Sequence, residues 1–204
     1  MEYRYYEIPA GSPVLALLGD KWVQNYGRDI DYLHFHNHLE VGFCYYGEGT
    51  VTFKEDIPFD GNMFTVIPKN FPHTTTSAGD SVSYWEWLFI DADKFLREVY
   101  KDNPRMAQKV LDRVNRRAHF VRVQDKPQIG ALVQQIIGCM RERKEFYLEE
   151  VKGLTLALLL QVARWNREEA EKTEFEAGNS SLITPAIDYI SECCDRPIKV
   201  EELA

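Results

Sequence analysis

The sequence predicts a fold that is mainly β plus α: a jelly-roll barrel over residues 1–92, followed by an antiparallel helical pair within residues 93–172. Short apolar segments divided by Gly and Asn turns fill residues 1–90, a pattern typical of antiparallel barrels and jelly rolls. Beyond Asp91 the apolar residues recur at every third or fourth position, which predicts helices. The 204 residues are enough for one such domain with an appendage.

Two segments give the clearest strand signals. Residues 39–46 alternate into an apolar strand, and the Gly-Glu-Gly turn at residues 47–49 leads into the next strand. Residues 81–90 predict a long strand, because large side chains alternate between its two faces. One face holds Trp85, Trp87 and Phe89, and the other holds Tyr84, Glu86 and Leu88. The sequence leaves open which face lies inside the barrel.

The helical region ends in a long helix, predicted over residues 147–172. Its apolar surface extends beyond one face, because Leu156, Ala157 and Leu160 widen the main stripe, and such a helix must be covered on two sides. One side faces the barrel or a neighbouring helix, and we predict that the other packs on the same helix of a second chain in a two-fold dimer. The predicted dimer interface is the main stripe: Leu148, Val151, Leu154, Leu158, Val162 and Trp165.

The last part of the chain predicts a third unit. Residues 173–182 have the composition of a linker. A new helical pattern then begins at Ile183 and is broken at Pro197, and residues 200–204 start another helix. We interpret residues 183–204 as the truncated start of a further domain, and the chain as a fragment of a longer protein.

Composition narrows the class of protein. The net charge is −8, whereas phosphate binding needs a basic surface, so we predict no DNA-binding residues in this fragment. No apolar run is long enough for a bilayer and no secretory signal opens the chain, which predicts a cytoplasmic protein with no membrane partner. The four cysteines form no CxxC pair and are expected to be reduced thiols. No nucleophile–base arrangement is visible.

Three histidines and one glutamate are the candidate functional residues. His34, His36 and Glu40 are separated by even numbers of residues, so on one continuous strand they would point to the same face. His73, on a later strand, could join them. Such a cluster is either a site for a divalent metal (Zn, Ni, Fe or Mn) or a polar pocket for an effector. No cofactor is required by the second interpretation.

Aromatic residues could complete a pocket. Trp22, Tyr46, Trp85 and Trp87 could line it and stack on a sugar or other ring ligand, although ordinary barrel core is the alternative for most of them. His38 has the same parity as His34 and His36, and we expect it to make a hydrogen bond at the barrel mouth instead. His119 lies in an Arg-rich stretch and is expected at the surface.

The histidine cluster also follows a known motif. His34, His36, Glu40 and Gly47 fulfil the pattern H-x-H-x3-E-x6-G, which resembles the first motif of the cupin superfamily. Gly61, Pro68 and His73 resemble the second motif in part: one extra residue separates the glycine and the proline, Asn70 replaces a glycine, and the final Asn is absent. The resemblance implies a cupin-like double-stranded β-helix over about residues 10–90.

A second resemblance concerns the end of the chain. Ile183, Ala186, Tyr189 and Ile190, followed by residues 197–204, are similar to the opening of the AraC-family DNA-binding domain, and residues 85–91 resemble the strand that closes the sensor barrel in these regulators. The resemblance implies an effector-sensing and dimerisation portion that controls DNA binding by a helix-turn-helix domain missing from this chain. It also implies a homodimer, a small-molecule effector that is often a sugar, and no enzymatic activity. The alternative is a metal-dependent cupin enzyme, a dioxygenase or isomerase, with His34, His36, Glu40 and His73 as ligands.

Overall fold

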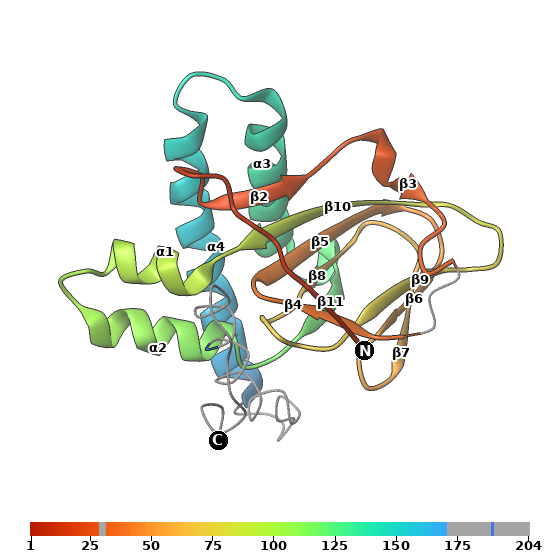
Figure 1. Ribbon diagram of the computed structural model, residues 1–204, viewed down its shortest axis with the longest axis horizontal. Coiled ribbons are helices and arrows are strands. Elements are labelled where there is room, and N and C mark those ends of the chain that lie inside the picture. Colours follow the sequence, from red (N-terminus) through yellow and green to blue (C-terminus); the bar gives the residue numbers. More distant parts are fainter. Residues whose placement is uncertain (29–31, 171–188, 190–204) are drawn as a thin grey trace.

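The computed structural model describes residues 1–28, 32–170 and 189. Apart from β11, its strands come first and its helices after, as the sequence predicts (Figure 1). The strands are β1 (Glu2–Arg4), β2 (Val14–Leu17), β3 (Val23–Gln24), β4 (His34–His36), β5 (Leu39–Tyr46), β6 (Gly49–Thr52), β7 (Asp56–Phe59), β8 (Met63–Val66), β9 (Thr74–Ser77), β10 (Ser83–Ile90) and β11 (His119–Arg122). The helices are α1 (Ala92–Val99), α2 (Pro104–Val114), α3 (Pro127–Glu142) and α4 (Tyr147–Ala170), with 3-10 turns η1 (Asp20–Trp22) and η2 (Val123–Asp125). The predicted linker (173–182) and helix-turn-helix start (183–204) lie outside the described residues, apart from Tyr189.

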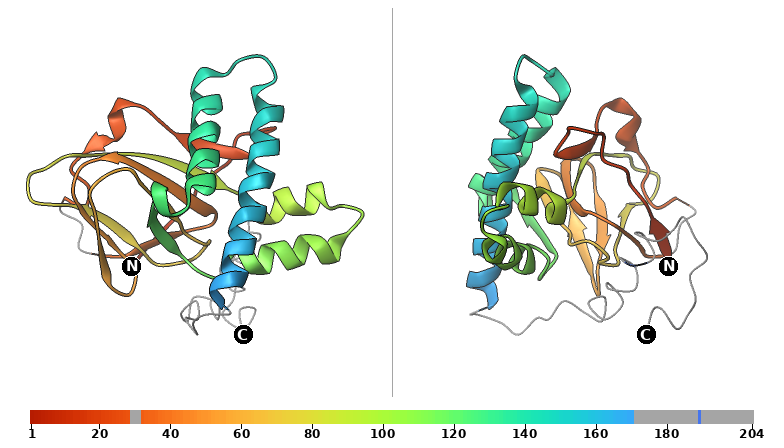
Figure 2. Two further views of the ribbon diagram at one scale, coloured as in Figure 1. Left: turned by 180° about the vertical axis from the view of Figure 1, so that it is seen from behind. Right: turned by 60° about the vertical axis from the view of Figure 1, so that its left-hand side comes forward.

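The strands form two antiparallel sheets and one short parallel pair. The larger sheet has the order β11-β8-β5-β10-β2, with β3 also paired to β10, and the smaller has the order β7-β6-β9. Strands β1 and β4 pair in parallel. Helices α3 and α4 stand against one side of the strands (Figure 2), so the larger sheet lies between the helices and the smaller sheet.

The central strands therefore have two different faces. In β10, Trp85, Trp87 and Phe89 belong to the apolar cluster between the sheets, together with Cys44, Val51 and Phe59. Leu88 and Ile90 belong to the cluster under the helices, as do Val41 and Phe43 of β5. Burial of each large apolar side chain stabilises the fold by roughly 1.5–3 kcal/mol. The question that the sequence left open is thus settled: the tryptophan face of β10 points between the sheets.

Local signals explain where the helices begin and end. The Asp91 carboxylate accepts a hydrogen bond from the Lys94 amide at the start of α1, and Asn103 does the same for Met106 at the start of α2, where Pro104 is the first residue. Helix α3 ends at Glu142, the residue that follows it, Arg143, has a φ of 49°, and α4 begins after a short connection. None of the helices in the described part of the chain is both long and apolar enough to span a bilayer.

A strand that the sequence did not predict lies inside the helical region. Strand β11 pairs with β8 at the edge of the larger sheet, and it places His119 in the interior, where its ring stacks on Trp165 with centroids 3.6 Å apart and its Nε2 contacts the Asn166 amide oxygen. The expectation that His119 lies at the surface is wrong. Short strands at a sheet edge carry little pattern of their own, because the pairing with β8 is a tertiary contact.

The predicted dimer stripe on α4 also needs correction. Val151, Leu158, Val162 and Trp165 are buried within the chain itself, in the core shared with α2, α3 and the sheet, while Leu148 and Leu154 are half-buried. These four side chains are therefore not available to a second chain. On the other side of α4, Leu156, Ala157 and Leu160 are also half-buried, and Leu156 and Leu160 touch the edge of this core.

A pair of leucine variants distinguishes the two faces of α4. We expect Leu158→Ala to lower the free energy of unfolding by about 2–5 kcal/mol, because it leaves a cavity in a fully buried site. Leu160→Ala, on the half-exposed side, should cost less than about 1.5 kcal/mol. Urea denaturation followed by far-UV circular dichroism measures both, and equal losses would contradict this assignment of the faces.

Candidate functional site

The four predicted residues do come together, although not on one strand. His34 and His36 lie on β4 and Glu40 on β5, and a bend at residues 37–38 separates the two strands. The bend is fixed by Asn37, whose side chain accepts a hydrogen bond from the Tyr6 amide and donates one to the Tyr6 carbonyl. The expectation of one continuous strand is therefore wrong, because a local side-chain interaction turns the backbone.

Backbone hydrogen bonds bring the second half of the cluster to the first. The amide and carbonyl groups of His34 and His73 exchange two hydrogen bonds of 2.9 Å. Glu40 and Ile67 form a similar bridge, and the Asn70 amide donates to the His36 carbonyl. Asn70 has a φ of 60°, which Asn tolerates better than most residues, so its place in the motif where a glycine is expected has a structural reason.

The side chains converge on a buried centre. His36 Nε2 lies 2.9 Å from one oxygen of Glu40, and His73 Nε2 lies 3.5 Å from the other. One ligand atom each from His34, Glu40 and His73 fall within 4.8 Å of one another. The exposed fractions of His36, Glu40 and His73 are 0%, 3% and 1%, so the centre is shielded from bulk water.

The outer nitrogens of two rings fix which nitrogen faces the centre. His36 Nδ1 lies 2.8 Å from the His38 carbonyl, and His73 Nδ1 lies 2.8 Å from the Phe71 carbonyl. Because a carbonyl only accepts, both Nδ1 atoms donate their protons to it, and in a neutral ring Nε2 then presents a lone pair to the centre. This second contact is how metal-binding histidines are usually oriented.

The charges at the centre follow from these contacts. Burial alone would raise the pKa of the Glu40 carboxyl, but the adjacent His73 and His36 hold it well below its usual range. Burial, followed by the neighbouring His73, lowers the pKa of His34 to about 3. Glu40 is therefore an anion and His34 a neutral ring near neutral pH.

Atoms at the centre lack partners of good geometry. Among the described residues, His34 Nδ1, His36 Nε2, His73 Nε2 and Glu40 Oε1 are buried without a hydrogen bond. A neutral imidazole lone pair and a carboxylate oxygen at 2.9 Å repel each other unless a proton or a cation lies between them. Nitrogen and carboxylate donors with this orientation suit a divalent metal, so the residues present fit such an ion.

A cavity of about 280 Å³ opens above His34, Glu40 and His73, and His36, which is fully buried, does not line it. Its aromatic walls are Tyr6, Trp22, Tyr26, Trp87 and Phe89, and two cationic residues, Arg4 and Arg28, also line it.

Two of the four predicted pocket aromatics, Trp22 and Trp87, are thus in place, whereas Trp85 is packed in the core and Tyr46 is 48% exposed elsewhere. The sequence analysis did not predict four other residues of the cavity lining, which are Arg4, Tyr6, Tyr26 and Arg28. Arg4 is positioned by the pairing of β1 with β4, and strands this short have no sequence signature. His38 lies outside this cavity and contacts the Tyr6 carbonyl through Nε2 at 2.9 Å.

Fold and site together define a domain of two facing sheets with a polar-floored cavity and a packed helical hairpin. Solved structures of ToxT from Vibrio cholerae share this fold. An apo variant of strain SCE256 has a TM-score of 0.57 at 13% identity, over 94% of this chain and 69% of ToxT. ToxT of strain O395 gives 0.54 at 12% over 94% and 66%, and a structure with a bound unsaturated fatty acid gives 0.51 at 9% over 94% and 66%.

Because the sequence identities are this low, the structural similarity shows a common fold alone. The chain spans about two thirds of the length of the ToxT structures. Comparisons with protein-family models and with curated proteins find no match.

A glycine under the cavity wall gives a test of this architecture. Gly42 of β5 is paired with Trp87 of the neighbouring strand β10. A Cβ added at Gly42 would lie 2.3 Å from the Trp87 ring. We expect Gly42→Ala to displace Trp87, change the tryptophan fluorescence and cost about 1–3 kcal/mol of stability. Gly153→Ala in α4, where nothing lies within 4 Å, is the control and should stabilise by about 0.5–1 kcal/mol. An unchanged emission spectrum in Gly42→Ala would contradict the contact.

Proposed function

We propose that this chain is the effector-sensing and dimerisation portion of an AraC-type transcription regulator. The main support is the cavity above His34, Glu40 and His73, which lies in a fold shared with ToxT, an AraC-family protein. Buried polar atoms without partners are costly to the fold, and their concentration at the floor of a cavity indicates a ligand. In this proposal the facing sheets are a cupin-like double-stranded β-helix.

The effector we propose is a small polar molecule, with a sugar as the first candidate. The floor offers imidazole and carboxylate groups to hydroxyls, and the faces of Trp22 and Tyr26 offer stacking surfaces for a ring. One ToxT structure contains an unsaturated fatty acid. A long alkyl chain would leave the floor groups of the present cavity unpaired, which favours a polar ligand here.

A divalent metal at the floor is part of the proposal, although an effector could contact the same groups directly. His34, His36, Glu40 and His73 would hold the ion, with Zn, Ni, Fe and Mn as candidates. A bound ion would supply a Lewis-acidic position for an oxygen atom of the ligand. The carbonyl contacts of His36 and His73 keep their Nε2 atoms directed at the floor in either case.

In this proposal, a helix-turn-helix domain of a longer, cytoplasmic protein binds the DNA, and the present chain controls that binding. The similarity of residues 183–204 to the opening of such a domain supports this, as does the extra third of the ToxT chain that has no counterpart here. Effector binding would alter the contacts of the sheets with the helices and so bias the placement of two DNA-binding domains.

Thermal-shift measurements with two ligand classes test the sensor proposal. We expect a monosaccharide among a panel to raise the melting temperature, since a ligand at 100 times its Kd stabilises by about 2.7 kcal/mol, and we expect oleate to have no effect. Trp22→Ala should abolish the shift, and Tyr46→Ala, an exposed aromatic outside the cavity, should retain it. Oleate alone as the stabilising ligand would overturn the polar-effector proposal, and no stabilisation by either class would count against sensing.

The metal-dependent cupin enzyme is the second candidate, because the unpartnered histidine and glutamate atoms at the floor also suit a catalytic ion. Elemental analysis of protein purified without chelator tests the ion. We expect one divalent ion per chain, and we expect His73→Ala to lose it. The control is His38→Ala, which should keep the ion because His38 lies between His36 and Glu40 in sequence but outside the cluster. Turnover of a bound small molecule would favour the enzyme, and binding without turnover would favour the sensor. Equal metal content in both variants would contradict the assigned ligands.

The homodimer we propose uses the half-exposed side of α4, in place of the buried stripe. Sedimentation at high concentration should give twice 23.8 kDa, because Leu156, Ala157 and Leu160 would pack across a two-fold axis. Leu160→Asp should give a monomer, and Lys101→Asp, a charge change on the exposed α1–α2 loop, should remain a dimer. A monomeric wild-type chain would refute this interface.

A further inference from the structure

A second buried carboxylate, Glu86, lies on the opposite face of the larger sheet from Glu40. It is fully buried and sits on β10 between Trp85 and Trp87, whose side chains point between the sheets. Glu86 itself points towards the helices, as its neighbour Leu88 does. A charge in this position is costly unless hydrogen-bond donors surround it.

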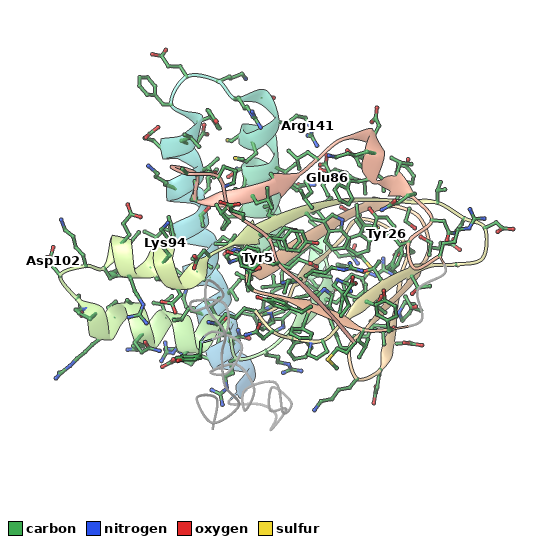
Figure 3. The ribbon with its side chains drawn as sticks, in the orientation of Figure 1. Tyr5, Tyr26, Glu86, Lys94, Asp102 and Arg141 are labelled. Atoms are coloured by element: carbon green, nitrogen blue, oxygen red, sulfur yellow. The ribbon has the colours of Figure 1, made fainter. Side chains whose placement is uncertain are left out.

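Four donors from four segments converge on the Glu86 carboxylate. One oxygen accepts from the Gly19 amide at 2.8 Å and the Tyr84 hydroxyl at 2.7 Å. The other accepts from the Tyr45 hydroxyl at 2.7 Å and from the Arg141 guanidinium. Figure 3 shows Arg141, from α3, next to Glu86, from β10. The loop before η1, strands β5 and β10, and helix α3 therefore meet at one side chain.

The protonation states fit this arrangement. Burial would raise the pKa of Glu86, but Arg141 and the other three donors bring it below its usual value, so the carboxylate is charged near neutral pH. Burial and the nearby Glu86 raise the pKa of both Tyr45 and Tyr84 to about 12. Both hydroxyls therefore keep the protons that they donate.

One partner connects Glu86 to the cavity wall. Gly19 directly precedes η1, and its carbonyl accepts a hydrogen bond from the Trp22 amide at 3.0 Å. Trp22 lines the cavity, as does Leu17 on the other side of the loop. The Gly19 backbone has a φ of 97°, a conformation that favours glycine. Two successive hydrogen bonds through Gly19 thus link Glu86 to the backbone of Trp22.

A second partner of Glu86, Arg141, connects it to the helical hairpin. Arg141 lies in the last turn of α3, just before the reversal at Arg143 that leads into α4. Helices α3 and α4 share a continuous core with the outer face of the sheet, which includes Ile137 and Leu158. A shift of the α3 end relative to the sheet would therefore change the contact of Arg141 with Glu86.

From these contacts we infer that Glu86 is a positioning residue that couples the Trp22 wall of the cavity to the α3–α4 hairpin. The inference rests on the proposed function, because it treats the cavity as the sensing site. A ligand that moves the Trp22 wall changes the Glu86–Arg141 contact, and a change at Arg141 alters the wall in return, since coupling between two sites is reciprocal. Proximity alone would not establish coupling, so the test measures one site while changing the other.

Hydrogen exchange of the ligand-free chain provides that test. Arg141→Met should accelerate amide exchange in residues 18–24 about tenfold, as expected for loss of a charged hydrogen bond that closes a local opening. Trp22→Ala should accelerate exchange in residues 136–146, and Arg141→Lys should partly restore slow exchange in residues 18–24. The control is Arg97→Met, which breaks an exposed ion pair with Asp93 on α1 and should affect α1 alone.

Three results would overturn the coupling: exchange unchanged in residues 18–24 of Arg141→Met, an equal increase in every segment, or no effect of Trp22→Ala on residues 136–146. Because Arg141 is half-exposed, its variants should fold, and Glu86→Gln provides a second variant with the same expected pattern. No ligand enters the experiment, so its failure would leave the sensor proposal standing. Conversely, a failed ligand screen would leave this coupling intact.

Discussion

The burial of the Glu40 carboxylate among histidines is the constraint on which the site depends. A carboxylate removed from water costs several kcal/mol unless opposite charge and hydrogen bonds compensate it. Here His36 and His73 lie against its two oxygens, and their outer nitrogens are held by backbone carbonyls. The backbone bridges at His34–His73 and Glu40–Ile67 then follow as the means of holding these groups together. The same constraint explains why the centre suits a proton or a cation and no neutral apolar ligand.

Strand parity gives the larger sheet two different faces. Phe89 faces Glu40 and Trp87 faces Gly42 on the side of the cavity, whereas Glu86 and Phe43 pair on the side of the helices. Each face therefore carries one buried carboxylate. One oxygen of Glu40 and the histidine nitrogens around it have no hydrogen-bond partner, while Glu86 has a partner for both oxygens. The first arrangement is suited to binding and the second to holding elements in place, because a satisfied network is rigid.

Sequence reasoning recovered what depends on local pattern. The general order of strands and helices and the meeting of His34, His36, Glu40 and His73 followed from spacing and turn residues. It failed where tertiary contacts decide. The bend at Asn37 depends on Tyr6, the interior position of His119 depends on Trp165, and the face of α4 that is buried depends on α2 and α3. When apolar residues extend beyond one face of a helix, the pattern does not indicate which of them meet the helix's own chain.

The fold shared with ToxT does not define the ligand of this cavity. At 9–13% identity, two chains can keep the same sheets and hairpin while every side chain in the cavity differs, and folds host unrelated functions for this reason. The ligand must therefore be argued from the cavity of this chain, where a charged floor lies beneath aromatic walls. The hairpin is different, because its position is set by packing that the fold requires. The four donors around Glu86 belong to this packing, because they join the larger sheet to the end of α3.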